Sequence, residues 1–351
     1  MSIGGVAARA AVVAAMAATL VTLRPSASGA CACGAFVAND KLSAQQETAL
    51  VDLNGRTESI TLSVLARSTA HEAAFLMPVP SRARFEMADA DLFAELDEIS
   101  KPDVEVREVV VDGDGSGGAA PPGGGATVVD RVEVGPYDVA QLAGTDATAV
   151  TAWLGDNGFT MPADLSGALT PYLADGWLVI AVRLAPSSGS LEDGLPPMRV
   201  SFETDTPVYP MRLSATAEHP QPLRLYVLAD HRVDISNPAP SGAGPELTFA
   251  GRVEPDPRHT ELAKALPGPR FLTRYDGEFQ PDLITSDILL TTAATDEPYR
   301  AVVVVTEYVT SSWPVPVENL TVLAVIAVAS TVTVMTVVAI RRRRARAAVG
   351  R

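Results

Sequence analysis

The sequence predicts an α+β protein in which antiparallel β-sheet dominates, with a few short helices and one C-terminal transmembrane helix. Two patterns predict the exterior β-rich part: short segments of alternating apolar and polar residues recur along the chain, and turn-forming residues separate them. A third observation predicts the anchor, because residues 320–340 are a run of 21 positions without a charge. A helix of that length is about 31 Å long, which matches the hydrocarbon thickness of a bilayer.

Residues 31–111 are expected to form a first β-rich lobe with one helix. In residues 47–67, apolar positions alternate on both sides of Asn54-Gly55, a pair that is typical of a tight hairpin turn. The other elements expected here are a buried strand at 73–79, a helix at 89–100 and a strand at 104–111.

Residues 112–126 contain seven glycines and no large apolar side chain, so we expect a linker or a long loop there. A second β-rich α+β lobe is expected at 127–309. Its expected elements are strands at 127–134, 137–142, 177–184, 198–203, 211–215, 223–228 and 299–309, and helices at 146–156, 165–173 and 259–266.

Residues 1–30 have the features of a secretory signal peptide. Their apolar run at 10–23 is too short to span a membrane, and small residues precede a cleavage position after Ala30. The alternative is a lipid on Cys31, but Ser28 stands where a lipoprotein signal usually has leucine. We therefore expect ordinary cleavage and an extracytoplasmic domain.

The C-terminal segments predict the orientation in the membrane. The juxtamembrane stretch 310–319 lacks a sortase sorting motif, so we expect the helix at 320–340 to remain as a permanent anchor. The basic tail 341–351 stays in the cytoplasm, because positive charges that flank a span are retained there. The topology signal consists of Arg341, Arg342, Arg343, Arg344 and Arg346. The sequence thus predicts a single-pass plasma-membrane protein with its N-terminus outside and its C-terminus in the cytoplasm.

The exterior part is strongly acidic. Residues 31–318 contain 19 basic and 42 acidic residues, a net charge of −23. Such a surface repels nucleic acid and favours solubility or association with cations. We therefore expect no nucleic-acid partner; the expected partners are the membrane, through one spanning helix, and an envelope protein, a glycan or a cation.

Cys31 and Cys33 are the two cysteines of the chain. Three interpretations are open: a local disulfide, a pair of thiols for metal or redox work, and a bond to another chain. We favour the disulfide, because the outside of a cell is oxidising. Metal binding requires further ligands, and no other cysteine and no histidine lies nearby in the sequence. The sequence therefore predicts neither a metal site nor a cofactor.

No catalytic constellation is recognisable in the sequence. His71 begins a motif like His-Glu-x-x-His, but Phe75 stands at the position of the second zinc ligand. Asp230-His231 could orient an imidazole for acid–base work with a distant serine that the sequence does not identify. Residues 112–117 resemble the start of a calcium loop, but Gly123 stands where a glutamate is required. We expect these to be ordinary loop or surface residues.

Six segments of the exterior part are informative as a set, namely 31–36, 75–81, 134–139, 153–159, 176–184 and 271–275. Together they resemble the bacterial family catalogued as domain of unknown function 2330, over about residues 31–290. The resemblance implies a secreted, often membrane-tethered bacterial protein, and it assigns no catalytic or binding residue. Relatives carry additional cysteines that this chain lacks, so no disulfide framework is carried over from them.

These observations lead us to expect a non-enzymatic envelope protein whose acidic exterior domain is an interaction or binding module. The alternative is an extracytoplasmic enzyme, either a hydrolase or a thiol-dependent redox protein, whose catalytic residues are dispersed along the chain.

Overall fold

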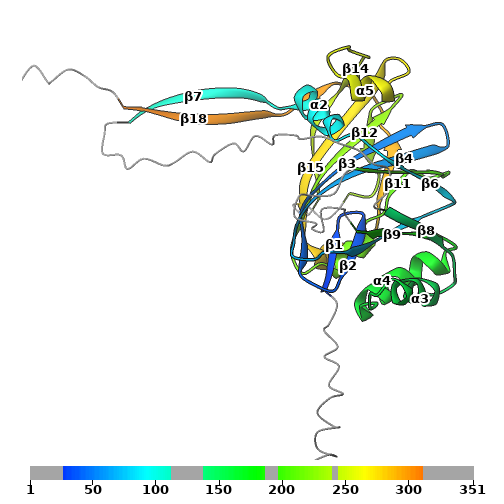
Figure 1. Ribbon diagram of the computed structural model, residues 1–351. Coiled ribbons are helices and arrows are strands. Elements are labelled where there is room, and N and C mark those ends of the chain that lie inside the picture. The colour runs from blue at the N-terminus through cyan, green and yellow to red at the C-terminus, as the bar shows by residue number, and fades with distance from the viewer. Residues whose placement is uncertain (1–26, 112–136, 186–196, 239–243, 311–351) are drawn as a thin grey trace, which may run out of the picture. The chain divides into compact units, whose positions relative to one another are not determined.

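The computed structural model describes residues 27–111, 137–185, 197–238 and 244–310. These residues form antiparallel sheets and a few short helices (Figure 1), which confirms the α+β class with antiparallel sheet dominant. The chain divides into two units, which we describe separately. The first contains residues 1–103 and 128–302, and the second contains residues 104–127 and 303–351.

A five-stranded sheet of the first unit has the order β1-β2-β5-β9-β8, with antiparallel neighbours. Its central strands are apolar on both faces, as expected for strands that are covered on both sides. In β2 and β5 every residue is buried. The strands are β1 (Ala27–Cys31), β2 (Gly34–Ala38), β5 (Ala73–Val79), β9 (Leu178–Leu184) and β8 (Tyr137–Leu142).

An eight-stranded sheet has the order β17-β14-β15-β12-β3-β4-β10-β6. Its neighbours are antiparallel except for β12 and β3, which are parallel. The strands are β17 (Tyr299–Arg300), β14 (Glu246–Val253), β15 (Arg270–Phe279), β12 (Gln221–Ala229), β3 (Leu42–Asn54), β4 (Thr57–Ser68), β10 (Met198–Glu203) and β6 (Ala83–Met87). A smaller three-stranded sheet has the order β11-β16-β13, from β11 (Val208–Tyr209), β16 (Ile288–Thr292) and β13 (Val233–Ile235).

The hairpin expected at 47–67 is confirmed as β3 and β4. Asn54 pairs with Thr57, so the turn residues are Gly55 and Arg56, one position later than the Asn54-Gly55 pattern indicates. Gly55 has a φ of 62°, a conformation that favours glycine. The register follows the apolar alternation, because Val51 lies opposite Ile60 and both belong to the core.

The expected helices are also found, as α2 (Asp91–Ser100), α3 (Thr148–Asp156), α4 (Ala163–Ala174) and α5 (Thr260–Ala265). Two short 3₁₀ helices are η1 (Arg212–Thr216) and η2 (Pro281–Leu283). The strand expected at 211–215 was wrong, since these residues form η1. The backbone turns there because the N–H groups of Met211 and Arg212 both donate to Oδ1 of Asp287, at 2.7 and 3.0 Å.

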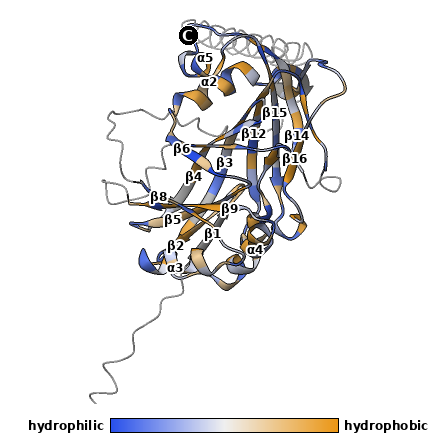
Figure 2. Cartoon of the chain, turned by 90° about the vertical axis from the view of Figure 1, so that its right-hand side faces the viewer, coloured by the Kyte–Doolittle hydropathy of each residue, from blue (hydrophilic) through white to orange (hydrophobic). Residues whose placement is uncertain are grey.

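Three hydrophobic clusters order the first unit in layers. The main core lies between the five-stranded and eight-stranded sheets, where Phe75 belongs to one sheet and Val51 to the other. The far side of the five-stranded sheet packs on α3 and α4, and the far side of the eight-stranded sheet packs on α2 and α5. Figure 2 shows the corresponding hydrophobic residues along the strands of both sheets.

Strands from both sides of the glycine-rich stretch are neighbours within these sheets. β3 and β4 come from residues 31–111, which we expected as one lobe, whereas β12 and β10 on either side of them come from 127–309. The two stretches therefore share sheets and a main core. The expected linker 112–126 and the expected strand 127–134 lie outside the described residues.

The second unit contains a two-stranded sheet of its own. It is formed by most of β7 (Asp103–Val111) and β18 (Val302–Thr310), which pair with each other. These are the strands that we expected at 104–111 and 299–309, although the latter is divided into β17 and β18.

The segments that we expect to form the signal peptide and the membrane anchor lie outside the described residues. Within the described part of the chain, no helix is both long and apolar enough to cross a membrane. The helix expected at 320–340 is not among the described residues, and neither are residues 311–319 of the expected juxtamembrane stretch 310–319. The same holds for the expected basic tail with Arg341, Arg342, Arg343, Arg344 and Arg346, and for residues 1–26 of the expected signal peptide. Strand β1 begins at Ala27, so cleavage after Ala30 would leave only Cys31 of this strand.

Candidate functional site

The β1–β2 hairpin carries both cysteines into the core. Cys31 ends β1 and pairs with Gly34, so Ala32 and Cys33 form the two-residue turn between them. Position 34 requires glycine because the backbone lies close to β5. A Cβ there would lie 2.5 Å from the carbonyl oxygen of Leu76 and 2.7 Å from the ring of Phe75. Because the hairpin end is pressed against β5 in this way, Cys31 and Cys33 are both fully buried.

Glu47 reaches the same place from β3. It stands two residues before Ala49 in an alternating strand, so it faces the main core together with Ala49 and Val51. It is 2 % exposed. The hydroxyl of Tyr209, on β11, donates a hydrogen bond to Oε1 of Glu47. The other oxygen, Oε2, is buried and has no hydrogen-bond partner in the described structure.

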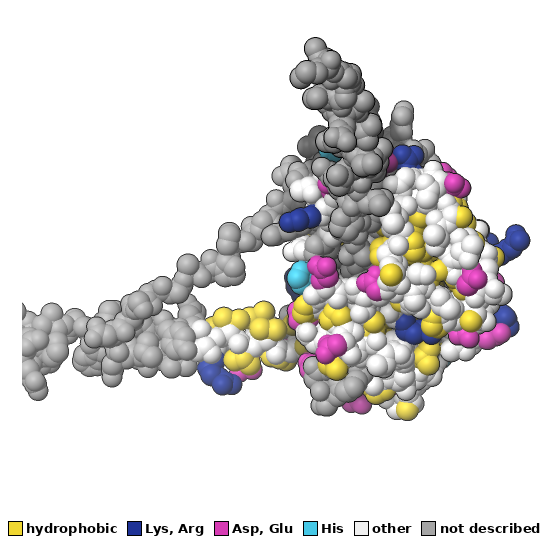
Figure 3. All heavy atoms as spheres, turned by 90° about the horizontal axis from the view of Figure 1, so that it is seen from below, with side chains coloured by type: hydrophobic (Ala, Val, Ile, Leu, Met, Phe, Trp, Pro, Cys, Tyr) yellow, Lys and Arg dark blue, Asp and Glu magenta, His cyan; other side chains and the backbone are white. Residues whose placement is uncertain are grey.

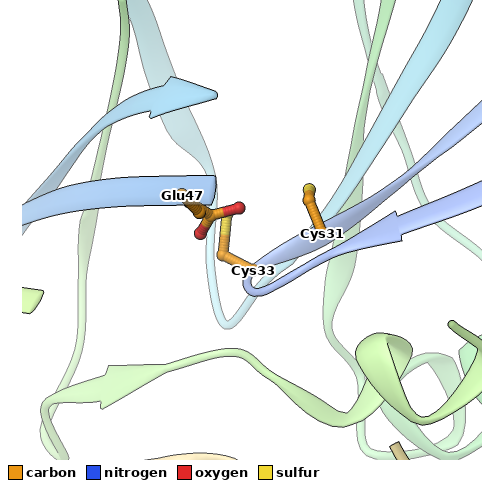
Figure 4. Close-up of side chains that lie close together, drawn as sticks. All are labelled: Cys31, Cys33 and Glu47. Atoms are coloured by element: carbon orange, nitrogen blue, oxygen red, sulfur yellow. The ribbon is translucent and has the colours of Figure 1, made fainter. Parts of the chain in front are cut away.

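The two thiols and the carboxylate meet inside the protein. One ligand atom from each of Cys31, Cys33 and Glu47 lies within 4.8 Å of the other two. Figure 4 shows the thiol of Cys33, in the hairpin turn, pointing at the carboxylate of Glu47, and Cys31 nearby at the end of β1. Glu47 thus joins two cysteines that stand 14 and 16 positions before it in the sequence, and the three residues form one buried cluster, which we call the thiol–carboxylate cluster.

The cluster is poor in positive charge. Among the described residues, no lysine or arginine forms an ion pair with Glu47. Burial raises the pKa of Glu47, and the hydrogen bond from Tyr209, followed by the interactions with the thiols of Cys33 and Cys31, partly offsets this effect. Burial likewise raises the pKa of Cys31 and raises the pKa of Cys33 well above its usual range, and the nearby carboxylate adds to both shifts. Burial without a paired cation therefore favours the neutral, protonated forms of these three side chains.

Two neighbouring contacts hold this region in place. Ser214, on η1, donates its hydroxyl to the carbonyl oxygen of Cys31 at 2.5 Å. On β11, the backbone N–H of Val208 donates to Oε2 of Glu58 at 3.1 Å, next to the contact between Tyr209 and Glu47. The ligand groups therefore come from elements that are fixed by packing and by hydrogen bonds, which is what a preorganised site requires.

The structure contains Cys31 and Cys33 as free thiols. The disulfide that we favoured from the sequence stays a prediction. Chemically, the cluster can bind a soft metal ion through two thiolates and one carboxylate, or its two thiols can form a disulfide when an external oxidant takes up their two electrons and their two protons are released. The sequence predicted no metal site because no further cysteine and no histidine stands near the two cysteines, whereas Glu47 joins them only through the fold.

The histidine candidates do not converge on this cluster. Nδ1 of His231 lies 3.0 Å from Oδ2 of Asp296, and its sequence neighbour Asp230 lies 3.7 Å from Nε of Arg270. The side chain of His231 is exposed. His71 is exposed, whereas Phe75 is buried in β5, so the incomplete zinc-protease motif does not lie on a helix. The calcium-like residues 112–117 lie outside the described residues.

Fold and cluster together define a class: an α+β protein, mainly antiparallel sheet, with a buried pair of cysteines at a hairpin beside a buried carboxylate. The chain belongs to the family described as an uncharacterized protein conserved in bacteria (DUF2330), whose profile matches residues 27–291. This match confirms the resemblance seen in the sequence.

Other comparisons add no function. No curated protein has a significantly similar sequence. A crystal structure of baculovirus P35 can be superimposed with a TM-score of 0.37 and 9 % sequence identity, over 72 % of this chain and 97 % of that chain. A similarity this low supports no argument about either fold or function.

Proposed function

We propose that this protein is a single-pass bacterial envelope protein whose exterior domain is a binding module, and that this domain holds a thiophilic metal ion, Zn²⁺, in the thiol–carboxylate cluster. The observation that carries the metal proposal is the convergence of Cys31, Cys33 and Glu47, three buried ligand groups, one of which keeps an unpartnered oxygen.

The chemistry of the ligands favours zinc. Thiolate ligands select zinc or copper(I), whereas calcium and magnesium prefer oxygen ligands. Zn–S distances of about 2.3 Å and Zn–O distances of about 2.1 Å require the ligand atoms to move closer together than 4.8 Å when the ion binds. The metal would also supply the positive charge that three buried acidic groups require.

Tyr209 is the positioning residue of this proposal. Its hydroxyl donates a hydrogen bond to Oε1 of Glu47, so Oε2 remains available to bind a metal. Hydrogen bonds of this kind orient a metal-binding carboxylate and tune its affinity. Three protein ligands leave one coordination position of a tetrahedral zinc ion for a small molecule.

The burial of the thiols argues against the redox version of the alternative, an extracytoplasmic enzyme. A thiol must be accessible and ionised to attack a disulfide. Cys31 and Cys33 are fully buried and their pKa values are raised. Their environment is that of structural or metal-binding cysteines.

The metal proposal is tested with the full chain, purified in detergent under reducing and metal-free conditions. Titration with Zn²⁺ is expected to give one bound ion per chain by mass spectrometry and a higher melting temperature. Glu47→Gln is expected to weaken binding by more than about 100-fold, and Tyr209→Phe by about 10- to 100-fold, the range for an outer-shell partner.

Glu86→Gln is the control, because Glu86 is an exposed glutamate on β6 and is not part of the cluster. It is expected to retain zinc affinity. If zinc binds Glu47→Gln and the unmodified protein equally well, or binds neither, the metal proposal is wrong. A preference for copper(I) over zinc would keep the cluster as a metal site and change the ion.

The anchoring part of the proposal rests on sequence features at 1–30, 320–340 and 341–351. Cells are fractionated, and the chain is compared with a version that ends after Thr310, the last residue of β18. The intact chain is expected in the membrane fraction, with the exterior domain accessible to added protease, and the shortened chain is expected in the soluble fraction. A shortened chain that remains in the membrane would contradict a C-terminal anchor.

A further inference from the structure

The two-stranded sheet of β7 and β18 has two free edges. In the described part of the chain, no third strand pairs with either of them. A strand at an edge presents unpaired N–H and C=O groups, which another strand can satisfy. A two-stranded sheet is also marginally stable in water when nothing covers it. We call this sheet the ribbon.

The ribbon exposes valines on both of its faces. Val303, Val304 and Val305 of β18 are consecutive and are 45–48 % exposed, although successive side chains of a strand point to opposite faces. On β7, Val104 and Val106 are 64 % and 55 % exposed. Figure 3 shows these hydrophobic side chains along the ribbon. Free edges combined with exposed apolar residues are typical of a surface that pairs with another chain.

The charges of β7 indicate which chain that is. Glu105 and Arg107 are both exposed and stand on either side of Val106. When two copies of β7 pair antiparallel about a two-fold axis at Val106, Glu105 of each copy lies opposite Arg107 of the other. Opposite charges in directly facing positions stabilise a strand pair, and like charges destabilise it. The edge of β7 is thus complementary to itself, as an isologous interface must be.

We propose that β7 pairs with β7 of a second copy of this chain, which gives a four-stranded sheet in the order β18-β7-β7-β18. The interaction satisfies one free edge in each copy and brings the valines of two ribbons together. Tethering both copies to one membrane, where the proposed anchor holds them, would raise their effective concentration further.

Charge reversal tests this pairing in the full chain, with the oligomeric state measured by sedimentation in detergent. The unmodified chain is expected to be a dimer. Glu105→Arg and Arg107→Glu each place like charges opposite one another twice, and each is expected to weaken the dimer at least about tenfold. The double variant with both changes restores opposite charges and is expected to dimerise as well as the unmodified chain.

Glu218→Arg is the matched control, an exposed charge reversal in the first unit that should leave the dimer unchanged. A second measurement does not depend on charge. Facing residues at the two-fold axis are about 5 Å apart between Cα atoms, which suits a disulfide. Val106→Cys is expected to form a cross-linked dimer on oxidation in membranes, whereas Val304→Cys, on the other strand, is not.

Several results would overturn the pairing. They are a monomeric unmodified chain at all concentrations, a double variant as weak as the single variants, and cross-linking that is equal at positions 106 and 304. Binding of the ribbon of a monomer to lipid vesicles or to a different protein would also replace the second copy as its occupant.

Discussion

Two buried glutamates hold the short strand β11 in the core. Glu47 accepts the hydroxyl of Tyr209, and Glu58 accepts the backbone N–H of Val208 at 3.1 Å. Each glutamate also has one buried oxygen without a hydrogen bond. Burying such a group is costly unless it is protonated or paired, so both residues make the stability of the domain sensitive to pH.

Glu58 gives the first prediction. Burial raises its pKa to about 8, whereas the unfolded chain ionises this side chain near 4.5. The native state therefore holds a proton that the unfolded state loses, and stability falls as the pH rises through the window from about 4.5 to 8. At about 1.4 kcal/mol per pKa unit, the loss over the whole window is on the order of 5 kcal/mol. Glu58→Gln is expected to reduce this loss, measured by urea unfolding at pH 5.5 and 8.5.

Glu86→Gln is the control, since Glu86 is exposed on β6 of the same sheet. Its unfolding free energy should vary with pH as that of the unmodified chain does. An equal pH dependence in Glu58→Gln and in the unmodified chain would mean that Glu58 is ionised in the native state.

Gly34 gives the second prediction. A methyl group there would meet the carbonyl oxygen of Leu76 at 2.5 Å, so the hairpin end must move away from β5. Gly34→Ala is expected to lower the free energy of unfolding by about 2 kcal/mol or more. Gly167→Ala is its counterpart, because Gly167 lies exposed in α4 with nothing within 4 Å, and it should stabilise by about 0.5–1 kcal/mol. Thermal unfolding of both variants is the measurement. It separates the clash of a methyl group at position 34 with β5 from the general effect of replacing a glycine by alanine.

At the scale of elements, α5 depends on α2 for the start of its helix. Its N-cap residue His259 forms no side-chain capping bond. Instead Glu95, from α2, accepts the backbone N–H of Leu262 at 2.7 Å and that of Glu261 at 3.2 Å. A carboxylate at this position satisfies free N–H groups and interacts favourably with the helix dipole.

Removing this contact is the third prediction. Glu95→Ala is expected to cost about 1 kcal/mol of unfolding free energy, in the range of a lost cap, and to speed hydrogen exchange at Leu262. Glu98→Ala, on the same helix, is expected to change stability by less than about 0.5 kcal/mol, because Glu98 is largely exposed. Equal exchange at Leu262 in both variants would contradict the capping role.

At the scale of the whole molecule, the order of strands in the eight-stranded sheet determines whether the chain separates into two pieces after cleavage by a protease within 112–126. β3 and β4 precede the glycine-rich stretch, and β12 and β10 follow it, yet they are neighbours in one sheet. Protease cleavage within 112–126 is therefore expected to leave two fragments that elute together from a sizing column and separate only in denaturant. Fragments that separate under native conditions, each of them folded, would contradict a shared core.

The helices and strands that could be predicted from the sequence are those with a strong local pattern of apolar residues. The hairpin at β3 and β4 followed from alternation around a glycine turn, and α2 followed from apolar spacing. The prediction of a strand at 211–215 was wrong because Met211 and Leu213 are both buried at alternate positions, as in a strand. The backbone turns there instead, and the N–H of Met211 donates to the carboxylate of Asp287. That carboxylate comes from residue 287, so no local pattern could reveal it.

Of the thiol–carboxylate cluster, the sequence clearly indicated the two cysteines and only weakly indicated Glu47. Glu47 extends the inward positions Ala49 and Val51, and a glutamate on the buried face of a strand is unusual enough to indicate a functional or structural role. Tyr209 carried no such signal, since its two-residue strand is placed by long-range pairing with β16.

The amino-acid sequence by itself determined the α+β class, most strands and helices, and the membership in a bacterial family, because periodicity and motifs are local properties of the chain. Only the tertiary structure decided which strands are neighbours and that Glu47 meets Cys31 and Cys33. These contacts join residues far apart in the sequence, and they exist because two sheets bury their apolar faces against each other.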